Sequence, residues 1–178
     1  MILLMGIQGS GKGTQGQLLA ESHGLKLLSM GDIIRAHATE QQRQRMLQGQ
    51  LLTDDEATEM IDQALQALPE GLDVILDGYP RTVSQAQWLF KQAETGRFSV
   101  DHIVHLTASR DAVKARLLSR GRADDTSEAI EKRFNEYERA TQPLFDWFDE
   151  QGIAVADINA ERSVEEVNDE LVKLINEK

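Results

Sequence analysis

Apolar positions along the chain follow two alternating patterns. Short apolar runs with the character of buried strands lie at residues 1–5, 25–28, 73–77, 103–107 and 153–158. Between and after them, apolar residues recur at helical spacing near residues 15–22, 33–35, 57–68, 85–93, 110–120, 127–140 and 164–175. Strands that alternate with helices predict an α/β fold, here a five-stranded parallel sheet with helices on both faces.

Helix start and stop signals support several of these elements. Thr53 with Glu56, and Ser163 with Glu166, form the capping-box pattern at two helix starts. Pro143 is expected to interrupt the long helix that follows residue 126. The polar, glutamine-rich stretch 36–50 indicates a small exposed helical insertion, whose movement would cost little. At 178 residues, the chain fits one domain.

The first strand runs into a glycine-rich turn, GIQGSGKGT, from Gly6 to Thr14. Glycine lets the backbone adopt positive φ and bring its N–H groups close to bound oxygens. Lys12 adds a positive charge, and the helix that opens near Gly11 directs its positive dipole end to the same place. The spacing fits the P-loop pattern GxxxxGK, except that Gly13 occupies the usual Ser/Thr position, so Thr14 must supply the hydroxyl. A purely structural turn is the alternative, and strand, loop, lysine and helix together favour phosphate binding.

Net charge and cysteine content argue against several classes of protein. A formal charge of -11 disfavours broad binding to nucleic acids or membrane surfaces, since both are polyanions. The absence of cysteine excludes disulfides, thiol catalysis and cysteine-ligated zinc, and it agrees with a reducing compartment. No cationic leader and no membrane-length apolar run is present, which predicts a cytoplasmic protein. Small anionic substrates stay possible if basic side chains gather locally.

Candidate chemistry also gathers at the predicted carboxyl ends of later strands. Asp77 ends the third apolar run and is followed by the sequence GYPRT at residues 78–82. In an open α/β sheet ligands sit outside these strand ends, so this stretch should lie beside the P-loop. Arg116 and Arg120 lie one turn apart on one helix face. His105, within the fourth run, is expected to be a structural histidine and not a catalytic one.

Six stretches, in the same order as in one family, carry a resemblance. They are GIQGSGKGTQ at residues 6–15, MGDIIR at 30–35, GQLLTD at 49–54, LDGYPRTVSQA at 76–86, RLLSRGRADD at 116–125 and KRFNEYERATQPL at 132–144. Together they resemble the nucleoside monophosphate kinases, and most closely the adenylate kinases, along nearly the whole chain. The resemblance implies a P-loop NTPase fold with one kinase domain at residues 1–178. It also implies a monophosphate-binding insertion at about 29–52 and a very short lid at about 120–126.

The activity implied by this resemblance is reversible transfer of the terminal phosphoryl group of ATP to AMP, giving two ADP. Such transfer requires in-line positioning, exclusion of water and neutralisation of charge, and it requires no general base. Magnesium would accompany ATP, and zinc would have no part. The expected partners are therefore the nucleotides ATP, AMP and ADP, with no nucleic acid or membrane, and the chain is expected to be a monomer.

The resemblance also assigns roles to single residues. The catalytic residues would be Lys12, Arg81, Arg120, Arg122 and Arg133. The ATP side would comprise Gly9, Ser10, Gly11, Lys12, Gly13, Thr14, Arg116, Arg120 and Arg162. The AMP side would comprise Met30, Arg35, Gln50, Leu51, Leu52, Gly78, Tyr79, Pro80, Arg81, Gln85, Arg122 and Arg133. The metal would be held by Asp77 and Asp32 through water, with Thr14.

The chain departs from the family pattern at several positions. Gln8 replaces the proline common in the family's loop. Met30 stands where adenylate kinases usually have a threonine that contacts adenine, and a thioether is a poor hydrogen-bonding partner. The insertion between Arg35 and Gly49 is short, and residues 120–122 leave almost no lid. Closure should therefore be a small movement that excludes water less completely.

Three alternatives follow from these features. Another small-molecule P-loop kinase, or a kinase that prefers UMP or CMP or has broad specificity, is the nearest. Thr82 and Gln85 favour adenine over a pyrimidine by family pattern, whereas Met30 weakens that preference. A nucleotide-dependent switch is the second, but GTP switches carry an NKxD motif and no Asn-Lys pair occurs in this chain. An inactive P-loop protein is the third, and Lys12, Asp77 and the arginines argue against it.

Overall fold

The sheet confirms the predicted architecture. The structure is a computed structural model that describes residues 1–47, 52–69, 71–121 and 125–177. Within this part of the chain, parallel strands form a five-stranded sheet in the order β2-β3-β1-β4-β5. The strands are β1 (Ile2–Met5), β2 (Lys26–Ser29), β3 (Val74–Asp77), β4 (His102–Thr107) and β5 (Ala156–Asn159). Since β1 is the central strand, the loop that follows it leaves from the middle of the carboxyl edge.

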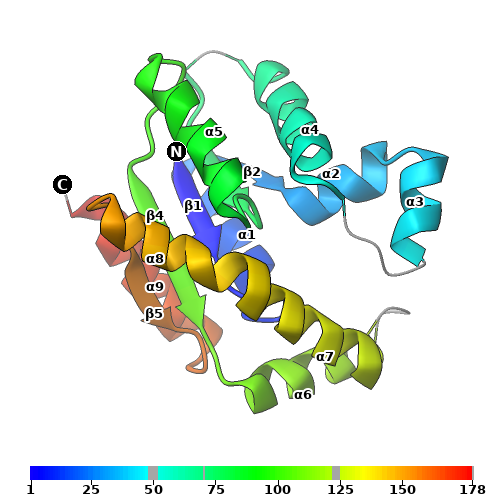
Figure 1. The fold of residues 1–178 in the computed structure, drawn as a ribbon. Coiled ribbons are helices and arrows are strands. Elements are labelled where there is room, and N and C mark those ends of the chain that lie inside the picture. Colours follow the sequence, from blue (N-terminus) through cyan, green and yellow to red (C-terminus); the bar gives the residue numbers. More distant parts are fainter. Residues whose placement is uncertain (48–51, 70, 122–124, 178) are drawn as a thin grey trace.

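Helices cover both faces of this sheet (Figure 1). They are α1 (Lys12–His23), α2 (Met30–His37), α3 (Glu40–Leu47), α4 (Asp54–Gln66), α5 (Val83–Glu94), α6 (Arg110–Arg120), α7 (Ser127–Glu136), α8 (Gln142–Glu150) and α9 (Val164–Asn176). Both predicted capping boxes are formed, at the starts of α4 and α9. Among the described residues, none of these helices is long and apolar enough to cross a membrane.

Alternate residues of β1 supply the two main cores, because successive side chains of a strand point to opposite faces of the sheet. Leu3 packs in a cluster with residues of α2, α4, α5 and α8. Leu4 packs in a second cluster with residues of α1 and α9. A third cluster joins the P-loop to α6 and α7 through Ile7, Leu117 and Phe134. The loop is therefore anchored to the helices that carry the predicted lid-side arginines.

The insertion and the start of α4 are tied together. Helix α3 occupies the polar stretch after α2, and the two helices extend to one side of the sheet (Figure 1). Arg45 of α3 forms an ion pair with Glu56 of α4. Gln42 Nε2 donates to the same carboxylate at 3.3 Å. Glu56 thus caps its own helix and holds α3 as well.

One element boundary differs from the sequence-based prediction, and one predicted interruption is present. The strand predicted at 153–158 begins only at Ala156, because the Ile153 N–H donates to Phe148 O at 2.8 Å and closes the turn after α8. The long helix is interrupted just before Pro143, by a π-helical turn at Tyr137–Thr141. Pro143 then lies in the first turn of α8, where its missing N–H costs little.

Candidate active site

The glycines of the P-loop are required by close contacts as well as by backbone angles. Gly6 has φ 131° and Gly9 has φ 95°. A Cβ on Gly6 would lie 2.6 Å from Leu106 O of β4, and one on Gly9 would lie 2.9 Å from Leu117 Cγ of α6. Any side chain at either position would displace the loop from the sheet and from α6.

Lys12 is the charged centre of the loop. It is only 8% exposed, and its Nζ donates to Gly6 O at 2.7 Å and to Ile7 O at 3.0 Å. Burial lowers the pKa of Lys12 from 10.5 to about 8; the Asp77 carboxylate opposes this, and the charges of Arg81 and Arg120 add to it. Three of the predicted site residues therefore lie close enough to Lys12 to shift its pKa.

Asp77 and the loop provide oxygen ligands of the kind that magnesium prefers. Asp77 ends β3 beside Leu4 of β1, and its Oδ2 would lie 3.8 Å from a Cβ on Gly13. Ser10 is fully buried, and its Oγ has no hydrogen-bond partner among the described residues. Within that part of the chain no cluster of three or more acidic, His or Cys side chains could cage a metal. This set fits Mg²⁺, which usually takes one or two carboxylates and completes its shell with phosphates and water.

The turn after Asp77 is held by its own polar groups. Arg81 Nε donates to Gly78 O at 2.8 Å. Tyr79 is buried, its hydroxyl lies 2.9 Å from Thr58 Oγ1, and burial raises the pKa of Tyr79 to about 12. The Tyr79–Pro80 peptide bond is cis. These contacts place Arg81 on the same sheet edge as Lys12.

Gln85 makes contacts that the sequence did not indicate. Only 5% of the residue is exposed. Its Oε1 accepts from the Arg81 N–H at 2.7 Å, and its Nε2 donates to Asp54 Oδ1 at 2.8 Å. The amide is therefore hydrogen-bonded to the protein through both its oxygen and its nitrogen. The predicted contact with adenine can use only the remaining N–H hydrogen and the remaining oxygen lone pair.

The start of α2 carries one buried residue and one exposed ion pair. Met30 is 3% exposed and belongs to the cluster under α2, α4 and α5, with its Cβ 3.8 Å from the position of a Cβ on Gly78. Its side chain is thus a core group next to the GYPRT turn. Asp32, expected near the metal, forms an ion pair with Arg35 one turn later, and both side chains are exposed.

A buried carboxylate gathers two predicted catalytic arginines. Asp125 Oδ2 accepts from Arg120 Nε at 2.9 Å, and Asp125 Oδ1 accepts from Arg120 Nη2 at 2.7 Å and from Arg133 Nη1 at 3.0 Å. The Asp125 side chain is completely buried. Sequence reasoning missed this residue, although its position just after the lid arginines could have indicated a partner for them.

The other ATP-side arginines lie near the end of β5. Arg116 Nη2 donates to Ala160 O at 2.6 Å. Arg162 Nε donates to Asn159 O at 3.2 Å, and its guanidinium pairs with Glu170. A cavity of about 330 Å³ lies here, lined by Thr107, Ala108, Ser109, Asn159 and Glu161.

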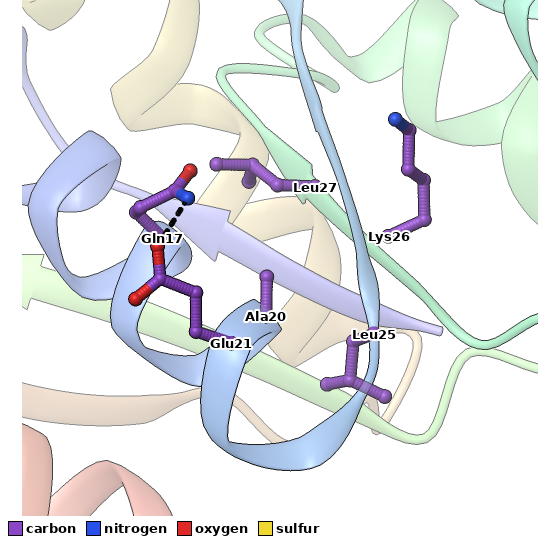
Figure 2. A pocket seen from close by; sticks show the side chains of 6 residues that line it. All are labelled: Gln17, Ala20, Glu21, Leu25, Lys26 and Leu27. Atoms are coloured by element: carbon purple, nitrogen blue, oxygen red, sulfur yellow. Dashed lines mark hydrogen bonds between the residues drawn. The ribbon is translucent and has the colours of Figure 1, made fainter.

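A second cavity, of about 250 Å³, lies between α1 and β2 (Figure 2). Its lining consists of Gln17, Ala20, Glu21, Leu25, Lys26 and Leu27. It contains none of the predicted site residues, and Figure 2 shows Gln17 and Glu21 bonded to each other along α1. This cavity is separate from the P-loop site.

Two further predictions concern His105 and the insertion. His105 Nδ1 lies 2.8 Å from Asp157 Oδ1 and its Nε2 lies 2.8 Å from the Tyr137 hydroxyl, so both ring nitrogens are paired, as expected of a structural histidine. Leu52 packs against the core. Three predicted site residues lie outside the described residues: Gln50, Leu51 and Arg122.

Comparison with known proteins agrees with this arrangement. Residues 4–153 match the family model described as adenylate kinase. "Adenylate kinase 1" of Nostoc sp. is 36% identical over 176 residues, covering 96% of this chain and 95% of that protein. "Adenylate kinase" of Corynebacterium glutamicum is 36% identical over 180 aligned residues, covering 98% of each chain. With a phosphate loop, an acidic strand end and converging arginines on one sheet edge, the chain is a phosphotransferase that belongs to the adenylate kinase family.

Proposed function

We propose that the site around Lys12 carries out reversible, magnesium-dependent phosphoryl transfer from ATP to AMP, giving two ADP. The observation that carries this proposal is a buried lysine within the P-loop, surrounded by the charges of Asp77, Arg81 and Arg120. The names of the relatives support AMP as the acceptor, and nothing in the comparisons favours UMP or CMP.

Charge neutralisation would come from groups that are already in place. Lys12 and the loop N–H groups would bind the transferring phosphate. Arg120 and Arg133, both bonded to Asp125, would stabilise the charge that spreads over its oxygens. Donors fixed before the reaction cost no reorganisation in the transition state. Arg122, which the resemblance places beside them, is proposed for the same task.

The AMP side would be formed by the GYPRT turn and the insertion. Arg35 and Arg81 are proposed to bind the phosphate of AMP, and Gln85 to read its base. Residues 78–80 would add backbone contacts to the ring, beside Met30. Gln50, Leu51 and Leu52 are proposed to line the same side of the acceptor site. Arg116 and Arg162, near the end of β5, are proposed for ATP.

Magnesium would be held mainly through Asp77, with the Thr14 hydroxyl at the start of α1 and Asp32 through water. When bound with ATP, it would supply positive charge that offsets the negative charge of the phosphates. The division into one domain with an insertion at about 29–52 and a lid at about 120–126, the monomeric state and the cytoplasmic location are further proposals.

A coupled assay that scans nucleoside monophosphates with Mg-ATP tests the proposed function. AMP, CMP, UMP and GMP should be compared at equal concentration, with ADP formation as the readout. AMP should have the highest kcat/KM. A preference for CMP or UMP would refute the assignment of AMP and leave only the broader reaction class, and no turnover with any of them would refute the activity.

A further inference from the structure

A carboxylate outside the predicted site connects the starts of α4 and α5. Asp54, in the first turn of α4, accepts from Thr82 Oγ1 with its Oδ2 at 2.8 Å and from Gln85 Nε2 with its Oδ1 at 2.8 Å. Thr82 Oγ1 in turn accepts from the Gln85 backbone N–H at 3.3 Å, as the cap of α5. Asp54 is therefore held against Gln85 by two hydrogen bonds, one to Gln85 itself and one to its helix cap.

These contacts allow the Gln85 amide only one orientation. A carboxylate can only accept hydrogen bonds, and the Arg81 N–H, 2.7 Å from Gln85 Oε1, can only donate. If the amide turned over, its oxygen would face the carboxylate and its NH₂ group would face the N–H. Both contacts would then be repulsive, at a residue that is only 5% exposed.

An amide with a fixed orientation distinguishes amino bases from oxo bases. After the two protein contacts, Gln85 has one N–H hydrogen and one Oε1 lone pair left. Adenine donates from N6 and accepts at N1, whereas hypoxanthine and guanine accept at O6 and donate at N1. An amide that could turn over would bind either pattern, but one fixed orientation matches a single pattern.

We propose that Asp54 is a positioning residue that fixes the Gln85 amide and so determines the preference for a 6-aminopurine over a 6-oxopurine. This inference rests on the proposed role of Gln85 in reading the base of AMP. Cytosine presents its amino group and ring nitrogen in the same order as adenine. The fixed orientation of the Gln85 amide therefore distinguishes amino bases from oxo bases. The choice between purine and pyrimidine depends on other contacts.

The test compares AMP with inosine monophosphate, which carries the 6-oxo pattern on an otherwise identical nucleotide. In Asp54→Ser the side chain is too short to reach Gln85, and the Thr53 cap of α4 is left unchanged. The ratio of kcat/KM for AMP to that for inosine monophosphate should fall about tenfold, the value of roughly one hydrogen bond. Both substrates are measured on one preparation, so a smaller folded fraction cancels from the ratio.

Two matched variants distinguish loss of the fixed amide orientation from a general effect of the Asp54→Ser substitution. Asp55→Ser removes an exposed charge from the same helix turn and should leave the ratio unchanged. Asp54→Asn retains an oxygen that can accept from Gln85, but its NH₂ group can also donate to the oxygen of a turned-over amide, so its ratio should lie between those of the unmutated protein and Asp54→Ser. The KM for Mg-ATP should not change in any of the three.

The outcomes distinguish this inference from the function on which it rests. An unchanged ratio in Asp54→Ser, together with a strongly lowered ratio in Gln85→Leu, would refute the positioning role of Asp54. Gln85 would still be the residue that recognises the base. An unchanged ratio in Gln85→Leu would refute recognition of the base by Gln85, and therefore also the positioning role of Asp54. The phosphorylation of AMP would not be affected by that result. Failure of the unmutated protein to phosphorylate AMP would refute the proposed function itself.

Discussion

Replacing Lys12 with methionine should separate stability from catalysis. Burial lowers the pKa of Lys12 from 10.5 to about 8, so keeping it charged within the loop costs on the order of 3 kcal/mol near neutral pH. Its hydrogen bonds to the carbonyls of Gly6 and Ile7 offset part of this cost, at about 0.5–1.5 kcal/mol each. Methionine has a similar length and no charge, so it removes both contributions. The free energy of unfolding should therefore change by less than about 2 kcal/mol.

Turnover should change far more than stability. The buried charge becomes favourable when phosphate oxygens approach it, and it is most favourable when negative charge builds up on the transferring group. Removing one preorganised donor from such a site typically lowers kcat by about 10²–10³, or about 3–4 kcal/mol. Lys12→Met should thus lose at least about a hundredfold in kcat while it stays folded.

The assay combines a coupled measurement of ADP formation with urea unfolding followed by circular dichroism. Lys26→Met is the matched control, because Lys26 is an exposed lysine at the start of β2, away from the P-loop. It should keep near-normal turnover. Near-normal turnover in Lys12→Met would refute the mechanism, and a large loss of stability in that variant would refute the account of the buried charge.

Three further predictions concern the arginines, the pH profile and the base. Arg133→Ala should lower kcat about a hundredfold with a smaller change in KM, because its guanidinium is proposed to act on the transition state; a rise in the KM for ATP alone would make it a ground-state binder. The kcat/KM for Mg-ATP should fall above about pH 8, since the free protein there loses the Lys12 charge. In pH–rate profiles, kcat should begin to fall at a higher pH than kcat/KM does, because bound phosphates raise the pKa of Lys12. A fall of both at the same pH would contradict this. Met30→Thr should raise the preference for AMP over CMP about two- to tenfold through a regained hydrogen bond. It should also lower the thermal midpoint, since Met30 is a core residue; an unchanged preference would remove position 30 from base recognition.

The sequence by itself determined the fold class and the phosphate-binding end of the molecule. Both depend on short-range patterns: apolar runs that alternate with helical spacing, capping boxes, and glycines at the positions where Gly6 and Gly9 take positive φ. The interruption near Pro143 was predictable for the same reason, because proline lacks an N–H. The start of β5 was not, since Ile153 has strand character but bonds locally to Phe148.

Only the tertiary structure decided which polar side chains are engaged with the protein and which are left for ligands. The bond between Gln85 and Asp54 joins residues 31 positions apart, and nothing in either local sequence indicates it. The burial of Met30 under the GYPRT turn and the pairing of Arg120 and Arg133 with Asp125 depend in the same way on how helices pack over the sheet edge. Local patterns specify elements because they act through neighbouring backbone, whereas a side chain's hydrogen-bond partners depend on which elements the fold brings within about 3 Å of it.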